Sequence, residues 1–216
     1  HPSLYEYILD FHIVQEEVVG LIRNACVGYY GNKDHMTQCG AFWSFSQMMN
    51  DPTLSVAVRD GIISTVRYAS VGHEVNQQAA GEAGLIRALV AVLHALNTGH
   101  LRSLHAVLDE GDMRVKTESA ACLRILCDES ESNSAEMVKC HGIPALLEVL
   151  ATGHTAAKEE AIAALANACC AHSKNLDFVN EKARRELQEV IAKSSSVSAE
   201  CKLFAKSVLI AWESSR

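Results

Sequence analysis

Ten histidines and eight cysteines are the residues of this chain that could bind a metal ion or act as nucleophiles. A structural zinc site needs four ligands that converge at short spacing. The chain has no Cys-x-x-Cys pair, and Cys140-His141 is its only Cys-His doublet, with no second pair beside it. The sequence therefore predicts no metal site. It also predicts eight free thiols, as in a protein of a reducing compartment.

His141 and His154 stand at the two ends of a short apolar segment, HGIPALLEVLATGH. We predict a helix of about 10 residues between them, which separates them by roughly 15 Å and excludes one shared metal ion. His154 would then lie near the N-cap of the next helix. The sequence also lacks Gly-x-Ser-x-Gly, a phosphate loop, His-Glu-x-x-His and Gly-x-Gly-x-x-Gly. We therefore expect neither an enzyme nor a cofactor.

The elements that hold these residues belong to a repeat. Residues 101–133 align without a gap on residues 143–175, an offset of 42, with ten identities in 33 positions. QEEVVGLIRNAC (15–26) also resembles KEEAIAALANAC (158–169). Apolar residues recur at i, i+3 and i+4 spacing, which predicts helices. No such helix could bury its apolar side alone, so the units must stack on one another.

EAGLIRALVAVL (82–93) and CHGIPALLEVL (140–150) resemble the second helix of armadillo repeats, and EEAIAALANAC resembles their third helix. The period of 42 lies in the range of armadillo and HEAT repeats. The resemblance implies an all-α, armadillo-like right-handed superhelical solenoid of three-helix repeats. We expect one repeat domain over residues 1–216 with four to five units, as a fragment of a longer protein that exposes Tyr5, Tyr7 and Phe11 at its first unit.

The expected units are an incomplete unit at 1–30 and further units at 31–71, 72–133, 134–175 and 176–216. The unit at 72–133 is irregular, because it holds about 15 residues more than one period. Two segments, GLIRALVAVL and LRSLHAVL, compete for its second helix. We expect an extra helix or a longer third-helix region between residues 84 and 111, and the sequence leaves the register open.

Armadillo third helices line the concave side of the superhelix. In importin-type arrays, a Trp-x-x-x-Asn pair on that helix grips an extended peptide. The Asn positions here hold Asn24, Tyr68, Ile125 and Asn167, and the Trp positions hold Gly20, Ser64, Ala121 and Ala163. Because no unit has the Trp, we do not expect a nuclear-import receptor. Trp43 and Gln47 have a similar spacing, but the alignment places them on a second helix that faces the core.

Glu17, Glu118 and Glu160 occupy one equivalent position, seven residues before the Asn position. Seven residues are close to two helical turns, so the resemblance places these carboxylates on the concave side with Asn24, Tyr68 and Asn167. Such a row predicts a partner segment that carries Lys or Arg. The alternative is that each Glu only complements the positive end of its helix dipole.

We therefore expect a non-catalytic protein-protein interaction scaffold that binds a partner segment along the concave groove. Two alternatives stay open: a regulatory helical domain that acts on one folded partner, such as a chaperone or small GTPase, and a structural cytoskeletal or axonemal component. The formal charge of −7 argues against a nucleic-acid partner. No apolar run reaches the ~18 residues of a membrane span, so we expect no membrane partner. The expected location is cytoplasmic, with nuclear or cytoskeletal locations as alternatives.

Overall fold

The computed structural model describes residues 4–27, 29–98, 109–192 and 197–216. In these ranges the chain forms helices and turns and no strand, which confirms the all-α prediction. The elements in chain order are α1 (Leu4–Cys26), α2 (Tyr30–Gln38), α3 (Ala41–Met49), α4 (Val56–Ser70), α5 (Glu74–Glu82), α6 (Leu85–Asn97), α7 (Asp109–Leu126), α8 (Glu131–Lys139), α9 (Gly142–Thr152), α10 (Thr155–Ala171), η1 (Ser173–Phe178), α11 (Glu181–Ala192) and α12 (Ala199–Ser214).

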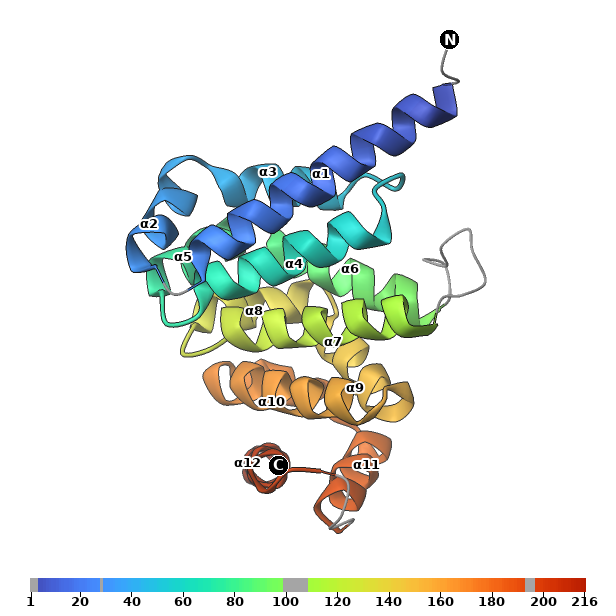
Figure 1. The fold of residues 1–216 in the computed structure, drawn as a ribbon. Coiled ribbons are helices and arrows are strands. Elements are labelled where there is room, and N and C mark those ends of the chain that lie inside the picture. The colour runs from blue at the N-terminus through green and yellow to red at the C-terminus, as the bar shows by residue number, and fades with distance from the viewer. Residues whose placement is uncertain (1–3, 28, 99–108, 193–196) are drawn as a thin grey trace.

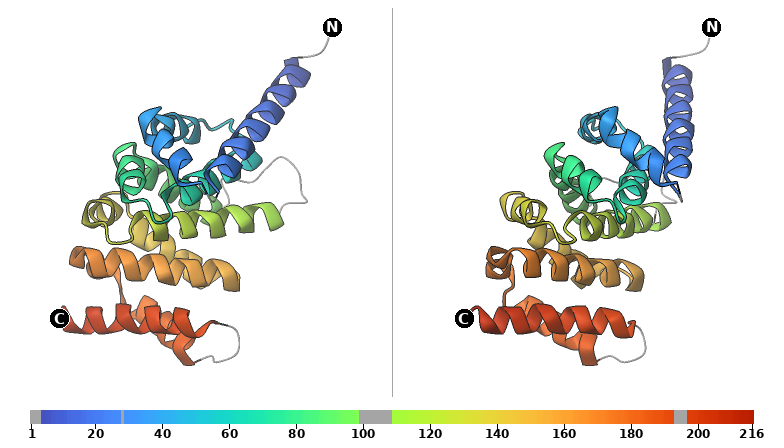
Figure 2. Two further views of the ribbon diagram at one scale, coloured as in Figure 1. Left: turned by 60° about the vertical axis from the view of Figure 1, so that its left-hand side comes forward. Right: turned by 90° about the vertical axis from the view of Figure 1, so that its left-hand side faces the viewer.

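The helices recur in the order first, second and third helix. This order holds for α2 to α4, for α5 to α7 and for α8 to α10, and η1, α11 and α12 follow it again. The third helices α4, α7 and α10 pack side by side, with α1 against α4 and α12 against α10 (Figure 1). Figure 2 shows the same succession from two further directions. The molecule is therefore a helical solenoid, as the repeat predicts.

Each second helix of the three central units begins after a residue in the left-handed backbone conformation. These residues are Gly40 at φ 70°, Gly84 at φ 87° and His141 at φ 58°. The sharp turn lets a second helix fold back against the first helix of its unit. Glycine adopts this conformation without strain, whereas His141 is one of the uncommon side chains that tolerate it.

Third helices begin at capping side chains. Ser55 before α4, His154 before α10 and Ser198 before α12 each accept a hydrogen bond from the backbone N–H three residues later. Such a cap satisfies one of the N–H groups that a helix start leaves unpaired. The predicted N-cap position of His154 is confirmed. Its ring accepts from the Ala157 N–H through Nδ1 and caps the helix.

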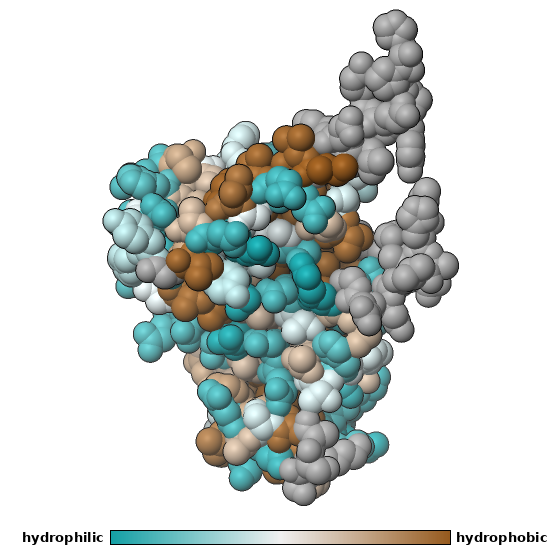
Figure 3. All heavy atoms as spheres, viewed as in Figure 1, coloured by the Kyte–Doolittle hydropathy of each residue, from teal (hydrophilic) through white to brown (hydrophobic). Residues whose placement is uncertain are grey.

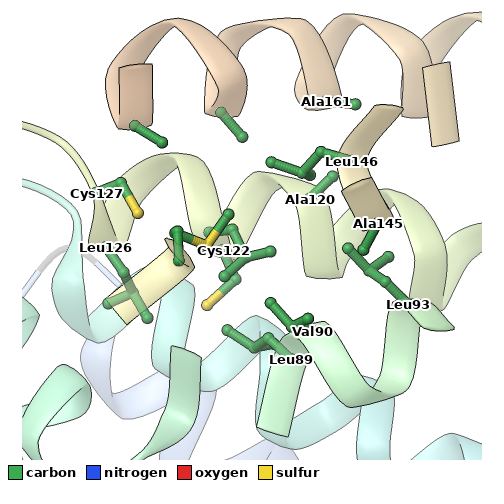
Figure 4. Close-up of a cluster of buried hydrophobic side chains, with 14 of the residues drawn as sticks. Leu89, Val90, Leu93, Ala120, Cys122, Leu126, Cys127, Ala145, Leu146 and Ala161 are labelled. Atoms are coloured by element: carbon green, nitrogen blue, oxygen red, sulfur yellow. The ribbon is translucent and has the colours of Figure 1, made fainter. Parts of the chain in front are cut away.

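The hydrophobic core runs without a break from unit to unit. Figure 4 shows one part of it, where Leu146 of α9 lies near the small side chains Ala120 of α7 and Ala161 of α10, and Leu93 of α6 lies near Ala145 of α9. All five side chains are buried. Small residues on the third helices let neighbouring units approach closely, and larger residues from the second helices fill the remaining space.

A buried asparagine joins each unit to the one before it. Asn76, Asn133 and Asn175 are at most 3% exposed. Each side-chain amide donates one hydrogen bond to the residue seven positions earlier, at the end of the preceding third helix. It donates a second bond to a carbonyl in the preceding first helix. We call these residues the clamp asparagines.

The clamp asparagines test the register that the sequence predicts. Their first acceptors are the carbonyls of Ala69, Leu126 and Ala168, and the half-buried Asn32 makes the equivalent bond to Ala25 at 2.6 Å. Each acceptor directly follows one of the four predicted Asn positions, 24, 68, 125 and 167. The equivalence of these four positions is therefore confirmed, and α1 occupies the place of a third helix.

The irregular unit contains α5, α6 and α7, and GLIRALVAVL provides its second helix, α6. The competing segment LRSLHAVL and the other residues at 99–108 lie outside the described residues, as do the side chains of Tyr5, Tyr7 and Phe11. The expected extra helix and the unit boundaries therefore stay predictions.

No single helix in the described ranges is long and apolar enough to cross a membrane. The pair α5 and α6 satisfies the same criterion only when taken together, across a bend of 69°. Most of the apolar residues of α6 are buried in the core of the solenoid.

Candidate protein-binding surface

The helices α1, α4, α7 and α10 form one continuous side of the molecule, which Figures 1 and 3 view from the front, whereas α12 is seen end-on in Figure 1. We call the exposed and half-buried side chains of α1, α4, α7 and α10 on this side the third-helix surface. Hydrophilic residues cover its middle, and hydrophobic side chains gather along α1 (Figure 3). The exposed apolar residues of α1 include Val14, Val18 and Leu21.

Glu118 on α7 is paired with Arg67 on α4. Nε of Arg67 donates to Oε2 of Glu118 at 2.8 Å, and Nη2 donates to Oε1 at 3.4 Å. The guanidinium also lies over the ring of Tyr68, 4.4 Å from its centroid. Burial disfavours the charge of Arg67, but Glu118 and Tyr68 outweigh burial and raise the arginine pKa above its ordinary value. Both carboxylate oxygens of Glu118 are therefore already matched by a cation of the same chain.

Glu160 and Asn167 on α10 both reach back to the preceding third helix. Nε of Arg124 on α7 donates to Oε2 of Glu160 at 2.7 Å. The amide of Asn167 donates to the Arg124 carbonyl at 2.9 Å and to Oδ1 of Asp128 at 3.2 Å. The other carboxylate oxygen of Glu160, Oε1, makes no hydrogen bond to any described residue. Half of this carboxylate thus stays available to a partner.

Glu17 and Asn24 stand on α1, and both are exposed. Nε of Arg23 donates to Oδ1 of Asn24 at 3.4 Å, a contact between sequence neighbours. In α4 the residue equivalent to Glu17 is Gly61, where an added Cβ would lie 3.1 Å from Cγ1 of Val19 on α1. This position therefore turns toward the preceding third helix in α4, as it does in α7 and α10.

The six predicted residues thus fall into separate groups on one surface. Tyr68 and Glu118 meet at Arg67, Glu160 and Asn167 meet at Arg124, and Glu17 and Asn24 lie apart from both groups on α1. The sequence prediction missed the two arginines. The signal was present, because Arg23, Arg67 and Arg124 recur directly before the Asn position in three units.

A further ion pair links α4 to α7. Nε of Arg114 donates to Oδ2 of Asp60 at 3.0 Å, and Nη2 contacts the same oxygen. Asp60 is buried, and the neighbouring carboxylate raises the pKa of Arg114. Together with the pairs at Glu118 and Glu160, this contact ties α4, α7 and α10 into one surface of fixed spacing.

Trp43 lies on the second helix α3, as predicted, but the prediction that it faces the core is wrong. The side chain is 63% exposed. Phe42, Phe45 and Met49 form the buried side of α3 at i, i+3 and i+7 spacing, so Trp43 falls on the solvent side.

The cysteines provide no reactive site in the core. All eight are free, and burial raises the pKa of Cys127 and Cys169 to about 12. Burial likewise raises the pKa of Cys140 and Cys201 to about 11. Because the thiolate is the nucleophile and the metal ligand, and these four thiols stay protonated near neutral pH, burial disfavours both roles. Among the residues that the structure describes, no three His, Cys, Asp or Glu side chains are placed to hold a metal ion.

Comparisons with known proteins agree with this architecture. Residues 130–170, which span α8 to α10, match the family model of the Armadillo/beta-catenin-like repeat. A search of curated proteins found no significant match. Solved structures match nearly the whole chain. One is an engineered protein with a TM-score of 0.75 and 16% identity, which covers 93% of this chain and 74% of that chain.

Two further matches are designed proteins. Computationally designed armadillo repeat proteins for modular peptide recognition give a TM-score of 0.71 at 17% identity, over 91% of this chain and 75% of that chain. A designed armadillo repeat protein in complex with the peptide (KR)4 gives 0.60 at 12% identity, over 91% and 92%. This chain therefore has the fold of armadillo repeat proteins, and its residues 130–170 match the model of one such repeat.

Proposed function

We propose that the protein is a non-catalytic scaffold that binds a segment of a partner protein along the third-helix surface. The observation that carries this proposal is the stack of α4, α7 and α10, which ion pairs fix into one continuous side. Because this surface is already ordered before binding, less conformational entropy is lost when a partner binds. Designed proteins of the same fold were made for modular peptide recognition, which supports the proposal.

A partner segment with Lys or Arg remains the finer proposal, and the geometry shows which carboxylates would contact it. Glu17 is exposed, Glu160 keeps Oε1 available, and Glu118 is occupied by Arg67. An exposed ion pair contributes only about 0.2–1 kcal/mol. Most of the affinity must then come from apolar contacts, for which Val18 and Leu21 on α1 are exposed.

The test measures binding of the labelled octapeptide (Lys-Arg)4 by fluorescence anisotropy. The variant Glu17→Gln/Glu160→Gln should bind about two- to thirtyfold more weakly than the parent protein at low salt. It should also lose part of the salt dependence, because exposed charges are screened within about 10 Å at 0.1 M salt.

Glu148→Gln/Glu213→Gln is the matched control, since both of its glutamates are exposed and the change in net charge is the same. The control should bind like the parent protein. If both double variants weaken binding equally, the peptide senses only the net charge, and the proposed role of the third-helix surface fails. If the parent protein does not bind (Lys-Arg)4, the basic-segment part of the proposal fails.

A further inference from the structure

An open hollow of about 520 Å³ lies at the edge of the solenoid, where the third-helix surface ends. The turns that follow α4 and α7 form it, on the left of Figure 1. Its lining consists of residues 72–74 before and at the start of α5, Gln77 and Gln78 of α5, and residues 128–132 before and at the start of α8. We call this feature the edge hollow.

The lining of the edge hollow is acidic. Glu74, Asp128, Glu129 and Glu131 contribute four carboxylates, and no Lys or Arg belongs to the lining. Asp128 accepts only the amide of Asn167, and Glu131 is 4.0 Å from His172. Neither Glu74 nor Glu129 has an ion pair within the described ranges. The edge hollow thus differs from the middle of the third-helix surface, where Arg67 already matches Glu118 and Arg124 matches one oxygen of Glu160.

Two helix ends offset only part of this charge. α5 and α8 both begin at the edge hollow, and the N-terminal end of a helix carries about half a unit of positive charge. Two such ends leave about three negative charges of four unmatched. Lys33 donates to the Val71 carbonyl in the adjoining turn, but it does not line the hollow. Helix capping alone therefore does not account for four carboxylates here.

Gln77 provides a second observation, independent of charge. It is only 8% exposed, it lines the edge hollow, and its side-chain amide has no hydrogen bond to any described residue. Its amide atoms do not belong to the buried side-chain atoms that lack a partner, so the small exposed part of Gln77 opens onto the hollow. A ligand in the hollow that presents hydrogen-bond donors would satisfy the amide oxygen of Gln77.

One wall of the edge hollow is held rigidly. His73 is buried, and its Nδ1 accepts a hydrogen bond from the Asn76 N–H at 3.2 Å. This assignment leaves the proton on Nε2, which donates to Oδ1 of Asp34 at 2.9 Å. Tyr30 stacks on the ring with centroids 4.9 Å apart. The wall is therefore formed before any ligand arrives.

The arrangement suits an organic cation better than a metal ion. The described residues hold no cluster of ligands close enough for a metal, and the carboxylates surround a space of several hundred Å³. An arginine guanidinium has five N–H donors in one plane and can bond several carboxylate and amide oxygens at once. We propose that the edge hollow binds an arginine side chain of a protein partner, as a site separate from the third-helix surface.

The test uses three labelled octapeptides, (Arg-Ser)4, (Lys-Ser)4 and (Gln-Ser)4, and measures affinity by anisotropy and the contacted amides by NMR. The parent protein should bind (Arg-Ser)4 most tightly and (Gln-Ser)4 not measurably. Backbone amides of residues 72–78 and 128–132 should shift on binding. Equal affinity for (Arg-Ser)4 and (Lys-Ser)4 would overturn the assignment to arginine, because lysine lacks the planar set of donors.

The hollow variant Glu74→Gln/Glu129→Gln/Glu131→Gln should weaken (Arg-Ser)4 binding about tenfold. The control Glu148→Gln/Glu200→Gln/Glu213→Gln has the same net charge and should weaken binding less than about twofold. Circular dichroism of both variants checks that the fold is unchanged. Equal weakening in the two triple variants would overturn the proposal, since the peptide would then follow only the net charge.

A last comparison separates this inference from the proposed function. Glu17→Gln/Glu160→Gln should leave the amide shifts at the edge hollow unchanged. Ser132→Arg, which adds a guanidinium at an exposed lining position, should compete with the peptide and reduce those shifts. If only Glu17→Gln/Glu160→Gln weakens (Arg-Ser)4 binding, the edge hollow is not a site, and the proposed function stands without it.

Discussion

Among single residues, the clamp asparagines test most directly how neighbouring units are held together. Asn133 is 3% exposed and donates to the carbonyls of Leu126 at 2.6 Å and Gln77 at 3.0 Å. Asn133→Ala removes both hydrogen bonds from a buried place. We expect it to lower the free energy of unfolding by about 2–3 kcal/mol, measured by urea denaturation.

Asn32→Ala is the control at the equivalent position. Asn32 is half-buried, and of the two hydrogen bonds that define the clamp it makes only the one to the Ala25 carbonyl. Its replacement should therefore lower the free energy of unfolding by about 1 kcal/mol. Gly81 belongs to the same feature, since a Cβ there would lie 1.8 Å from Oδ1 of Asn133. If Asn133→Ala costs no more than Asn32→Ala, burial of the clamp is not what stabilises the contact between units.

At the scale of an element, the left-handed residue before each second helix sets where that helix begins. Gly40 has φ 70°, and no atom lies within 4 Å of a Cβ built on it. Gly40→Ala therefore adds backbone strain without a steric clash. It should lower the free energy of unfolding by about 1–2 kcal/mol, which thermal or urea denaturation would detect.

Gly20→Ala provides the opposite case on α1. A Cβ at Gly20 also meets nothing within 4 Å, but Gly20 lies inside a helix. Alanine favours the helix there and restricts the unfolded chain, so stability should rise by about 0.5–1 kcal/mol. Two substitutions of the same type should thus change stability in opposite directions. The same sign for both would contradict the role given to the turn at Gly40.

On the scale of the whole molecule, stability should be graded along the solenoid. In a repeat array each unit contacts only its neighbours, and local opening costs least where a helix packs on one neighbour only. Among the third helices of this chain, α7 packs between α4 and α10, whereas α12 packs on α10 alone. Amide hydrogen exchange should be slowest in α7 and α10 and faster in α12. Uniform protection from α4 to α12 would show that the array opens only as one unit.

The sequence by itself determined the helical class, the repeat and the equivalence of residues 24, 68, 125 and 167. These features depend on local chemistry: apolar residues at helical spacing, and identical residues at equal offsets. Part of the candidate site followed from the same alignment, which placed Tyr68, Glu118, Glu160 and Asn167 on third helices.

Only the tertiary structure decided what those residues contact. Glu118 meets Arg67 from 51 residues away, and Glu160 meets Arg124 from 36 residues away. The edge hollow likewise joins two turns from successive units. Helical periodicity tells which residues share one side of a helix, but the rotation of each unit against the next decides which side chains pair and which stay exposed. Trp43 is a further example. Packing against neighbouring helices determines which side of α3 is buried, and the tryptophan lies on the exposed side.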